Sequence, residues 1–371
     1  MSKALIAMSG GVDSSVAAKL ILDAGFECIG CTMKLNPGDG EKELQQNSMQ
    51  DALICEARQQ CCTLEDTEDA RSVAFKLGMP FYAFNFKDEF REKVIDQFVD
   101  CYLSGHTPNP CIECNRCLKF GKLLERAQIL GCDYVVTGHY ARIVRKNGRF
   151  ALLKAPDETK DQSYVLYSLT QEQLSRVLFP VGDLTKNKTR EIAEENGFIN
   201  SHKPDSQDIC FVPTGKYADV IKKFTGKEYP EGDFVFKDGT VLGKHKGIIW
   251  YTRGQRKGLG LASEEPLYVL RVDPKTNNVY LGREKDLYSK ELIAGDFNWT
   301  GGIIPDTEIN CKAKIRYRQK EQPCTAKVLQ NGDVKVTFDE PQRAITPGQA
   351  CVLYDGDEVL GGGTILIENE V

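Results

Sequence analysis

The sequence has no long apolar run. Nowhere do the roughly eighteen apolar residues of a membrane-spanning helix follow one another, and the first residues lack the apolar core of a signal peptide. From these absences we expect a cytoplasmic protein with no membrane partner. An excess of positive charge is also missing, since 48 Lys and Arg stand against 53 Asp and Glu, for a net charge of −5. The negative net charge therefore argues against a nucleic-acid partner. This argument is weak, because local patches of charge and not the total decide phosphate contacts.

Cysteine, in contrast, is abundant, with 14 residues in the chain. In a reducing compartment, thiols more often bind metal, act in catalysis or fill the core than form a disulfide framework. A length of 371 residues suits two or three domains with ample core. The contents of 41% hydrophobic and 27% charged residues are typical of a globular protein.

The sequence has no internal repeats and no low-complexity segments. The domains are therefore predicted from changes in the pattern of apolar and turn-forming residues along the chain. Up to residue 210, short apolar runs alternate with helical patterns, which predicts an α/β domain with a parallel sheet covered by helices. Beyond it, short β-rich runs separated by Gly, Asp and Asn predict small antiparallel barrels. We expect an ATP-binding α/β domain over 1–210, a small central β-rich domain over 211–280 and a C-terminal β-barrel domain over 281–371.

Individual elements can be assigned within this plan. The buried strands expected in the α/β domain are 3–8, 27–33, 80–85 and 133–137. Its expected helices are 14–24, 65–77, 88–103, 117–130 and 186–196, and the polar stretch 36–59 is expected as a surface excursion. The β-rich runs that follow are 233–236, 248–250, 267–272, 279–281, 312–317, 325–328, 334–338 and 350–353.

The first expected strand runs directly into Ser9-Gly10-Gly11-Val12-Asp13-Ser14, and a helix follows. A tight turn at a helix N-terminus presents several backbone N–H groups, so it favours a phosphate or pyrophosphate. Gly10 and Gly11 let the backbone approach the anion closely, and nearby serine hydroxyls add donors. The Gly-Lys-Ser/Thr of a Walker A loop is missing. The pattern resembles instead the PP-loop of ATP pyrophosphatases, which split ATP between its α and β phosphates.

Cys111 and Cys114 form a CxxC pair within residues 107–120. Two prolines disfavour a helix just ahead of Cys111, so we expect the next helix to begin near Asn115. Cys114 would then lie at the N-terminal end of that helix, where the dipole favours the reactive thiolate. Such a pair can form a disulfide, share a metal or pass sulfur. Cys117, one turn further on, is expected to pack.

Three further features allow a functional and a structural interpretation. Cys210 follows a polar turn and, taken alone, is more typical of a structural cysteine. His139 follows an apolar strand at the carboxyl end, where ligands gather in open α/β sheets, which favours a ligand contact over the alternative of a hydrogen-bonded structural histidine. Cations alternate along the expected strand 312–317 and just beyond it, and they can either follow a phosphate backbone or be solvated. They are Lys312, Lys314, Arg316, Arg318 and Lys320.

Taken together, the motifs resemble those of one family. In chain order they occupy residues 9–14, 107–120, 137–140, 160–164, 205–211, 251–260, 314–318 and 347–349. Over essentially its whole length the chain is similar to the bacterial tRNA-specific 2-thiouridylases, the MnmA/TrmU family. The resemblance implies ATP-dependent replacement of oxygen by sulfur at C2 of the wobble uridine in tRNAs for Lys, Glu and Gln. The implied partners are the anticodon arm of these tRNAs and a sulfur donor such as a cysteine desulfurase or a relay protein.

The resemblance also implies roles for single residues. ATP adenylates the C2 oxygen, a persulfide sulfur on Cys114 attacks C2, and Cys210 closes a disulfide on Cys114 and releases the sulfur. Asp13 is implied on the Mg²⁺ or pyrophosphate side, and the target uridine flips into the pocket. The implied ATP site comprises Ala7, Met8, Ser9, Gly10, Gly11, Val12, Asp13, Ser14, Met33 and Gly138. The implied tRNA contacts are Asn109, Pro110, Cys111, His139, Lys160, Asp161, Gln162, Arg316, Tyr317 and Gln349, the first three at the target base.

Cys111 departs from the family pattern, since many members have Asp there, and this leaves the acid–base role of the position open. The alternative is a [4Fe–4S] cluster on Cys111, Cys114 and Cys210, with one iron left open to bind sulfide. Two other functions also stay open. One is another PP-loop ligase or amidotransferase, against which the thiols argue, and the other is a non-enzymatic iron–sulfur, tRNA-binding module. The sequence leaves undetermined the sulfur donor, the oligomeric state, the preference among tRNAs and the roles of Cys61 and Cys62.

Overall fold

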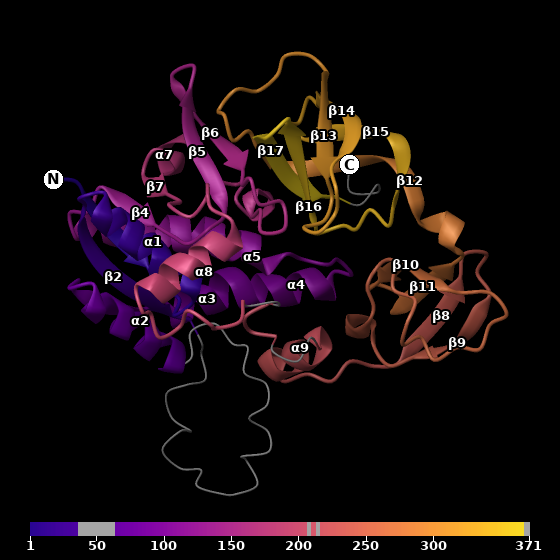
Figure 1. Cartoon of the computed structure of the whole chain (residues 1–371). Helices are drawn as coiled ribbons and strands as arrows, with labels where there is room; N and C mark the ends of the chain where they lie inside the picture. The colour runs from indigo at the N-terminus through magenta and orange to yellow at the C-terminus, as the bar shows by residue number, and fades with distance from the viewer. Residues whose placement is uncertain (36–63, 206–208, 213–215, 367–371) are drawn as a thin grey trace, which may run out of the picture. The chain divides into compact units, whose positions relative to one another are not determined.

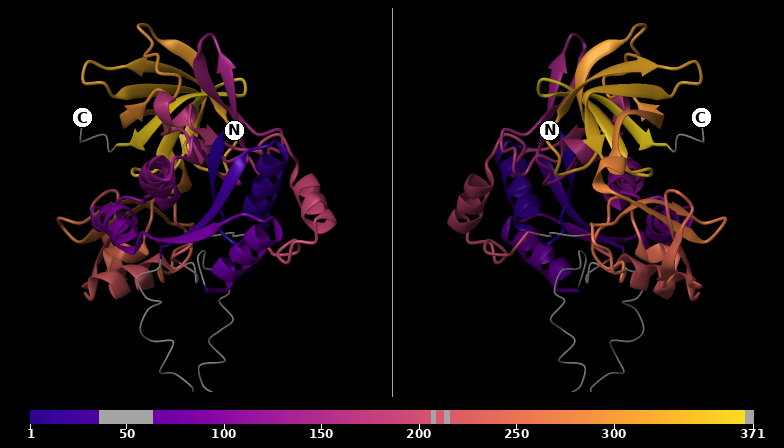
Figure 2. Two further views of the ribbon diagram at one scale, coloured as in Figure 1. Left: turned by 90° about the vertical axis from the view of Figure 1, so that its left-hand side faces the viewer. Right: turned by 90° about the vertical axis from the view of Figure 1, so that its right-hand side faces the viewer.

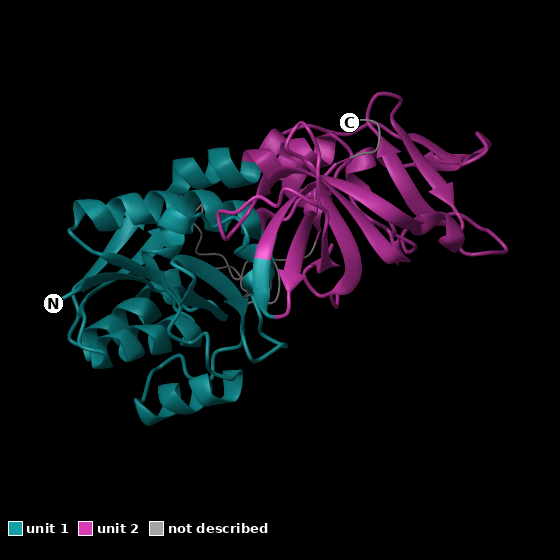
Figure 3. Cartoon of the chain, turned by 90° about the horizontal axis from the view of Figure 1, so that it is seen from above, with its two compact units in different colours: residues 1–95, 111–215, 357–359 teal, residues 96–110, 216–356, 360–371 magenta. Residues whose placement is uncertain are grey.

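A computed structural model describes residues 1–35, 64–205, 209–212 and 216–366 of the chain (Figure 1). The predicted excursion over 36–59 and the pair Cys61 and Cys62 lie outside the described residues. The chain forms two compact units (Figure 3). Unit 1 comprises residues 1–95, 111–215 and 357–359, and unit 2 comprises residues 96–110, 216–356 and 360–371. Within the described ranges, no helix combines the length and the apolar character needed to cross a membrane.

Unit 1 is built on a five-stranded parallel sheet, which confirms the predicted fold class. Its strands are β1 (Lys3–Ala7), β2 (Glu27–Lys34), β3 (Phe81–Asn85), β4 (Tyr134–Val136) and β7 (Val177–Leu178). The spatial order is β3-β2-β1-β4-β7, and the first four strands confirm the four that were predicted. Since β2 and β4 flank β1 on opposite sides, the strand order reverses at β1. In open α/β sheets, ligands bind at the carboxyl ends of the strands at such a point.

Three helices share one buried core with this sheet (Figure 1). They are α1 (Val12–Asp23), α2 (Leu64–Lys76) and α8 (Lys186–Glu195). Small residues such as Ala17, Ala74 and Ala193 join Ile6 of β1 in the core cluster. Their short side chains let the helices pack closely, so α1 contacts both α2 and α8.

The chain between β3 and β4 is largely helical. Its elements are α3 (Lys87–Phe90), the π-helical η2 (Arg91–Asp96), α4 (Gln97–Leu103), α5 (Pro110–Glu113), the π-helical η3 (Cys114–Lys122) and α6 (Leu123–Ile129). The sequence predicted that the helix after the CxxC pair begins near Asn115. This prediction is wrong, because the helical segment begins at Pro110. Proline suits the first turn of a helix, where its missing N–H is not needed and its fixed φ is already helical.

A β-hairpin in unit 1 was missed in the sequence. It consists of β5 (Ala141–Lys146) and β6 (Arg149–Lys154), with Asn147 at φ +52° and Gly148 at φ +79° between them. Two consecutive residues with positive φ are the mark of a type I′ turn, for which Asn-Gly is the preferred pair. Beyond it come η4 (Ser163–Val165) and α7 (Gln171–Leu174). The Asn-Gly dipeptide was the signal that could have revealed this hairpin.

The first part of unit 2 holds a small four-stranded sheet. Its elements are α9 (Tyr217–Thr225), β8 (Gly232–Phe236), β9 (Val241–His245), η5 (Ile248–Trp250), β10 (Tyr268–Asp273) and β11 (Asn278–Gly282). The strand order is β10-β11-β8-β9. The predicted strand over 248–250 is wrong, since η5 is a 3-10 turn in which Trp250 N donates to Gly247 O at 3.3 Å. Its apolar residues Ile248 and Ile249 are nevertheless buried, so the apolar run marks core without marking a strand.

The second part of unit 2 is a closed six-stranded barrel, seen in yellow and orange in Figure 2. After η6 (Glu284–Leu287) its strands are β12 (Tyr288–Asn298), β13 (Ile309–Lys314), β14 (Gln322–Val328), β15 (Val334–Arg343), β16 (Ala350–Asp355) and β17 (Glu358–Ile365). Pairing of β12 with β17 closes the barrel, which confirms the predicted β-rich C-terminal part. The predicted stripe of five cations on one strand is wrong, because β13 ends at Lys314 and Arg316 lies in the bend that follows.

Candidate active site

The loop between β1 and α1 lies at the carboxyl edge of the parallel sheet. The N-cap of α1 is Gly11, which has no side chain to accept from the N–H groups of the first turn. Ser14 Oγ donates to Gly11 O at 3.0 Å, and Ser9 N donates to Ser14 Oγ at 3.2 Å, so the loop is closed by its own residues. The first-turn N–H groups of a helix have no intrahelical acceptor, and the dipole adds positive potential there. This loop therefore has the geometry of an anion site.

Two glycines of the predicted ATP site are required by close packing. Gly10 has φ +75°, and a Cβ added to it would lie 2.3 Å from the backbone oxygen of Asp66. A Cβ on Gly138, just after β4, would lie 2.6 Å from the backbone nitrogen of Ser14. The other predicted residues lie at the same edge, with Met8 directly after β1 and Met33 near the end of β2, both buried. The structure therefore brings the predicted ATP-site residues together.

Asp13, in the first turn of α1, is held by two side chains that the sequence analysis missed. Its Oδ1 accepts from Tyr140 OH at 2.8 Å and from Lys186 Nζ at 2.6 Å. Lys186 is nearly buried, with 9% of its side chain exposed, while 30% of the Asp13 side chain is exposed. Burial and the Asp13 charge together raise the pKa of Tyr140, so the phenol stays protonated and donates. Asp13 is therefore a fixed carboxylate next to the anion loop.

Asp205 gathers three cations. Its Oδ1 lies 2.7 Å from Lys186 Nζ and 3.2 Å from Arg190 Nη2, and its Oδ2 accepts from Lys160 Nζ at 2.7 Å. Burial acts to raise the pKa of Asp205, but the hydrogen bonds from Lys160 and Lys186 outweigh it, so the pKa is lowered. Asp13, Lys186 and Asp205 thus form a continuous charged chain.

The segment 200–205 also supports the loop directly. Asn200 Nδ2 donates to Gly10 O and to Ser15 Oγ, both at 2.9 Å. Lys203 Nζ lies 2.7 Å from Asp66 Oδ1 and 2.6 Å from Asp69 Oδ2, in the first two turns of α2. These bonds fix the anion loop against a segment almost two hundred residues later in the chain.

The CxxC cysteines lie on the helical segment that starts at Pro110. Cys111 is exposed in the first turn of α5, and partly exposed Cys114 is the first residue of η3. The prediction that Cys114 occupies a helix N-terminus is therefore wrong, and no dipole argument for its thiolate applies. Asn115, next to it, is buried and donates to Val165 O at 3.0 Å, which fixes η3 against η4. Burial raises the pKa of the Cys117 thiol, in keeping with its predicted packing role.

Cys210 is partly exposed and lies in a turn in which Val212 N donates to Ile209 O at 2.9 Å. The neighbouring Phe211 is buried, with its ring edge against Phe90 at 5.8 Å between centroids. Phe90 belongs to α3, and α3 also contacts η3, which begins at Cys114. The segments that carry Cys114 and Cys210 therefore both contact α3. Among the described residues, Cys111, Cys114 and Cys210 included, no three His, Cys, Asp or Glu side chains form a group able to hold a metal ion.

The predicted tRNA contacts at residues 160–162 have partners inside unit 1. Lys160 pairs with Asp205, and Asp161 Oδ1 accepts from the backbone nitrogen of Ala155 at 3.1 Å. Gln162 Oε1 accepts from the backbone nitrogen of Tyr140 at 3.0 Å. The turn is thereby fixed beside Tyr140 and hence beside Asp13.

His139 is buried, which favours its structural interpretation over the predicted tRNA contact. Its Nδ1 lies 2.7 Å from Thr137 Oγ1, and its ring packs against Phe120 and Phe179. Burial, with a smaller effect of Lys119, lowers its pKa well below the usual value, so the ring is neutral.

Five further predicted tRNA contacts belong to unit 2, namely Asn109, Pro110, Arg316, Tyr317 and Gln349, whereas Cys111 belongs to unit 1. Gln349 Nε2 donates to the carbonyl oxygens of Thr107 and Pro108 at 2.8 and 3.1 Å, and thereby holds the loop that continues into Asn109 and Pro110. Arg316 Nη2 donates to Ala344 O at 2.6 Å and lies 3.2 Å from Thr346 Oγ1. Tyr317 is 40% exposed, so its ring is accessible for stacking.

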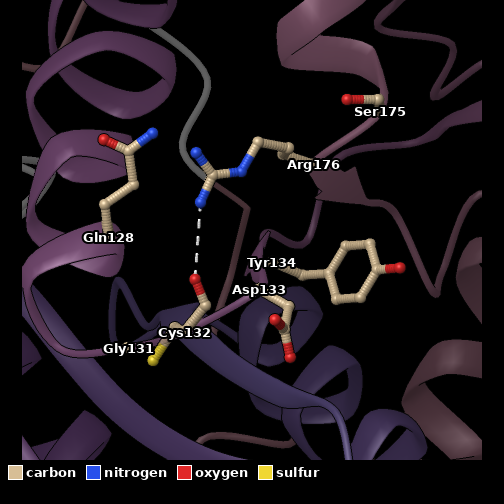
Figure 4. Close-up of a pocket in the computed structure, with 7 residues that line it drawn as sticks. All are labelled: Gln128, Gly131, Cys132, Asp133, Tyr134, Ser175 and Arg176. Atoms are coloured by element: carbon tan, nitrogen blue, oxygen red, sulfur yellow. Dashed lines mark hydrogen bonds between the residues drawn. The ribbon is translucent and has the colours of Figure 1, made fainter.

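A separate open pocket of about 440 Å³ lies at the opposite edge of the sheet (Figure 4). It is lined by Gln128, Gly131, Cys132, Asp133, Tyr134, Ser175 and Arg176. Tyr134 begins β4, so the pocket lies at the amino ends of the strands, whereas ligands of such sheets bind at the carboxyl ends. We therefore place the candidate active site at the loop after β1.

Tyr140, Lys186, Arg190, Asn200 and Lys203 are the site residues that the sequence analysis did not single out. Lys186 and Arg190 are four positions apart and therefore share one face of α8, which was a usable signal. Asn200 and Lys203 carried no such pattern.

Comparisons with known proteins cover nearly the whole chain. The family described as tRNA methyl transferase HUP domain matches residues 2–214, the tRNA methyl transferase PRC-barrel domain matches 218–283, and the aminomethyltransferase beta-barrel domain matches 289–365. The tRNA-specific 2-thiouridylase MnmA of Clostridioides difficile is 49% identical over 365 residues, covering 98% of both chains. That of Acetivibrio thermocellus is 49% identical over 366 residues, covering 98% of this chain and 99% of the relative. A solved predicted subunit of tRNA methyltransferase from Methanocaldococcus jannaschii is 14% identical, with a TM-score of 0.31 over 53% of this chain and 75% of its own.

Proposed function

Because the chain belongs to the family of tRNA-specific 2-thiouridylases, we propose that it uses ATP to replace the C2 oxygen of the wobble uridine by sulfur in tRNAs for Lys, Glu and Gln. Family membership by itself supports 2-thiolation of tRNA by an ATP-using PP-loop enzyme. The wobble position, the tRNA set and the route of sulfur are the finer parts of this proposal. The observation that carries it is the anion loop with its fixed Asp13, at the sheet edge where ligands bind.

The first step takes place in the proposed ATP site, which consists of residues 7–14, Met33 and Gly138. The C2 oxygen of uridine attacks the α-phosphate, the bond between the α and β phosphates breaks, and pyrophosphate leaves. The N-terminus of α1 supplies positive potential and N–H donors to the departing anion. The Asp13 carboxylate and the hydroxyls of Ser9 and Ser14 are oxygen donors of the kind that suits Mg²⁺, which when bound there would neutralise phosphate charge.

In the second step, the terminal sulfur of a Cys114 persulfide attacks C2, and AMP leaves with the original oxygen. The Cys210 thiolate then attacks the inner sulfur of Cys114, forms a disulfide with it and releases the product sulfur on the tRNA. A thiol reductant has to reduce this disulfide before the next turnover, and a persulfide donor such as a cysteine desulfurase has to recharge Cys114. Anchoring of both cysteine segments on α3 supports their pairing.

The [4Fe–4S] route is the alternative for the same reaction. Among the described residues, no three cysteines form a group able to hold a cluster, so the proposed reaction proceeds without one.

For tRNA recognition, we propose that Asn109, Pro110 and Cys111 meet the flipped base. We propose that Lys160, Asp161, Gln162, Arg316, Tyr317, Gln349 and, if the turn around it opens, His139 contact the anticodon arm. The domains proposed at 1–210, 211–280 and 281–371 would divide the work, with chemistry in the first and docking surface in the other two.

The test uses unmodified tRNA for Lys, with ATP, Mg²⁺ and a persulfide source, and scores 2-thiouridine by mass spectrometry and AMP by chromatography. Cys114→Ser and Cys210→Ser are each expected to abolish 2-thiouridine while tRNA affinity stays nearly unchanged. Cys117→Ser is the matched control and is expected to remain active. Product only from cluster-loaded protein supplied with sulfide would replace the persulfide route, and absence of tRNA-dependent AMP and of 2-thiouridine from both preparations would refute the function.

A further inference from the structure

Lys186 lies between Asp13, next to the anion loop, and Asp205, in the segment 200–205 that precedes Cys210 in the chain. Its Nζ lies 2.6 Å from Asp13 Oδ1 and 2.7 Å from Asp205 Oδ1, and only 9% of its side chain is exposed. Asp13 belongs to the first turn of α1, and Asp205 lies five positions before Cys210 in the chain. A single nearly buried ammonium group thus bonds to both segments.

A buried lysine is retained only where carboxylates compensate its desolvation. Removal of the ammonium would leave the carboxylates of Asp13 and Asp205 facing the same space without their shared cation. Charge-assisted hydrogen bonds are short and strongly directional, so their loss removes the contacts by which Lys186 ties Asp13 to Asp205. Removal of the ammonium would therefore affect both the anion loop at Asp13 and the segment that contains Asp205.

The rest of α8 strengthens the connection on the thiol side. Arg190, one turn further on the same helix face, donates to Ser201 O at 3.0 Å and to Lys203 O and Asp205 Oδ1, both at 3.2 Å. Lys186 and Arg190 therefore hold Asp205 from one rigid helix. Lys160 binds the other oxygen of Asp205 and brings in the turn at residues 160–162.

We propose that Lys186 is a positioning residue that couples the ATP loop to the Cys210 segment through Asp13 and Asp205, so that the adenylating and sulfur-releasing groups are held in register. This rests on the proposed function for the roles of the two ends. The two ion pairs of Lys186 belong to the fold, and the proposed coupling to Cys210 can be measured without substrate.

The test compares Lys186→Met with Lys186→Arg, which keeps the charge, and with Lys188→Met as the matched control. Lys188 lies on the same helix, with half of its side chain exposed, and its Nζ pairs with Glu191 Oε2 at 3.0 Å. In Lys186→Met we expect kcat of tRNA-dependent AMP release to fall by about 10- to 100-fold, as for a positioning error near 1 Å. The KM for ATP is expected to change much less, Lys186→Arg to recover most of kcat, and Lys188→Met to match the wild type.

The decisive readout is the rate at which iodoacetamide alkylates Cys210 in the absence of ATP and tRNA, followed by peptide mass spectrometry. Lys186→Met and Asp205→Asn are each expected to change it by about tenfold. The double variant should be no worse than either single variant, because residues that act through one contact are not additive. Thermal unfolding, run in parallel, identifies variants that have lost their fold, and alkylation is measured well below the transition.

Unchanged alkylation of Cys210 in folded Lys186→Met would overturn the proposal, as would effects of the two single variants that multiply in the double variant. An effect confined to the KM for ATP would also overturn it, since Lys186 would then act as a phosphate ligand. Failure of the wild type to form 2-thiouridine would refute the proposed function alone, because the alkylation result decides the coupling independently.

Discussion

Gly138 gives the sharpest test of the anion-loop geometry. A Cβ added there would lie 2.6 Å from the nitrogen of Ser14 and 2.7 Å from the carbonyl carbon of Asp13, both backbone atoms that no side-chain rotation can move. Ordinary contact begins at 3.4 Å, so in Gly138→Ala the start of α1 has to move away by about 0.8 Å. Gly138 does not have a positive φ, so the effect of the substitution is steric.

The expected loss follows from this displacement. Overpacking of a tight contact typically costs about 1–3 kcal/mol of folding free energy. A shift close to 1 Å in a reacting group costs roughly 100-fold in rate, so we expect kcat/KM for tRNA-dependent AMP release to fall by about 10- to 100-fold. The assay titrates ATP at saturating tRNA and records AMP, while urea unfolding reports the free energy of unfolding.

Gly131→Ala is the matched control, at the other end of β4. Nothing lies within 4 Å of the Cβ it would add, but its φ of +68° strains any other residue. It should therefore lose about 1–2 kcal/mol of stability while keeping the kinetic constants for ATP. If Gly138→Ala kept wild-type kcat/KM, or if Gly131→Ala lost as much, the contact between Gly138 and α1 would not set the ATP site.

Two further predictions concern His139 and Gln349. His139 has its pKa held well below the usual value by burial, so the unfolded chain binds a proton near pH 6.5 that the folded chain does not, and stability falls as pH drops below about 6.5. Urea unfolding between pH 5 and 7 should show this slope of the free energy of unfolding against pH, to which His139 contributes at most about 1.4 kcal/mol per pH unit. His139→Gln should remove that contribution. An unchanged slope in the variant would contradict the burial of His139 as a neutral ring. Gln349→Leu removes the donor from the carbonyls of Thr107 and Pro108 and should cost about 1–3 kcal/mol in urea unfolding, whereas a loss of tRNA affinity at full stability would instead support a direct RNA contact.

Sequence reasoning worked where a local pattern has one physical solution. The apolar runs at 3–8 and 27–33 became β1 and β2 because continuous apolar runs suit a sheet buried on both faces. It failed at 248–250, where a glycine at φ +115° turns an apolar run into a 3-10 turn. It failed again at Cys114, since Pro110 was taken as a helix breaker although proline also fits a first helical turn.

By itself, the sequence determined the parallel sheet, the anion loop at 9–14, the identity of the thiols and the family to which they belong. These depend on residues that are adjacent in the chain or fixed in type. Only the tertiary structure decided that Asp13 is bonded to Lys186, that Asp205 and Asn200 support the loop and that His139 is buried. Such contacts join residues separated by up to 190 positions, as between Gly10 and Asn200. Nothing in the local pattern specifies them. The bond between Asp13 and Lys186, for example, depends on the packing of α8 against α1.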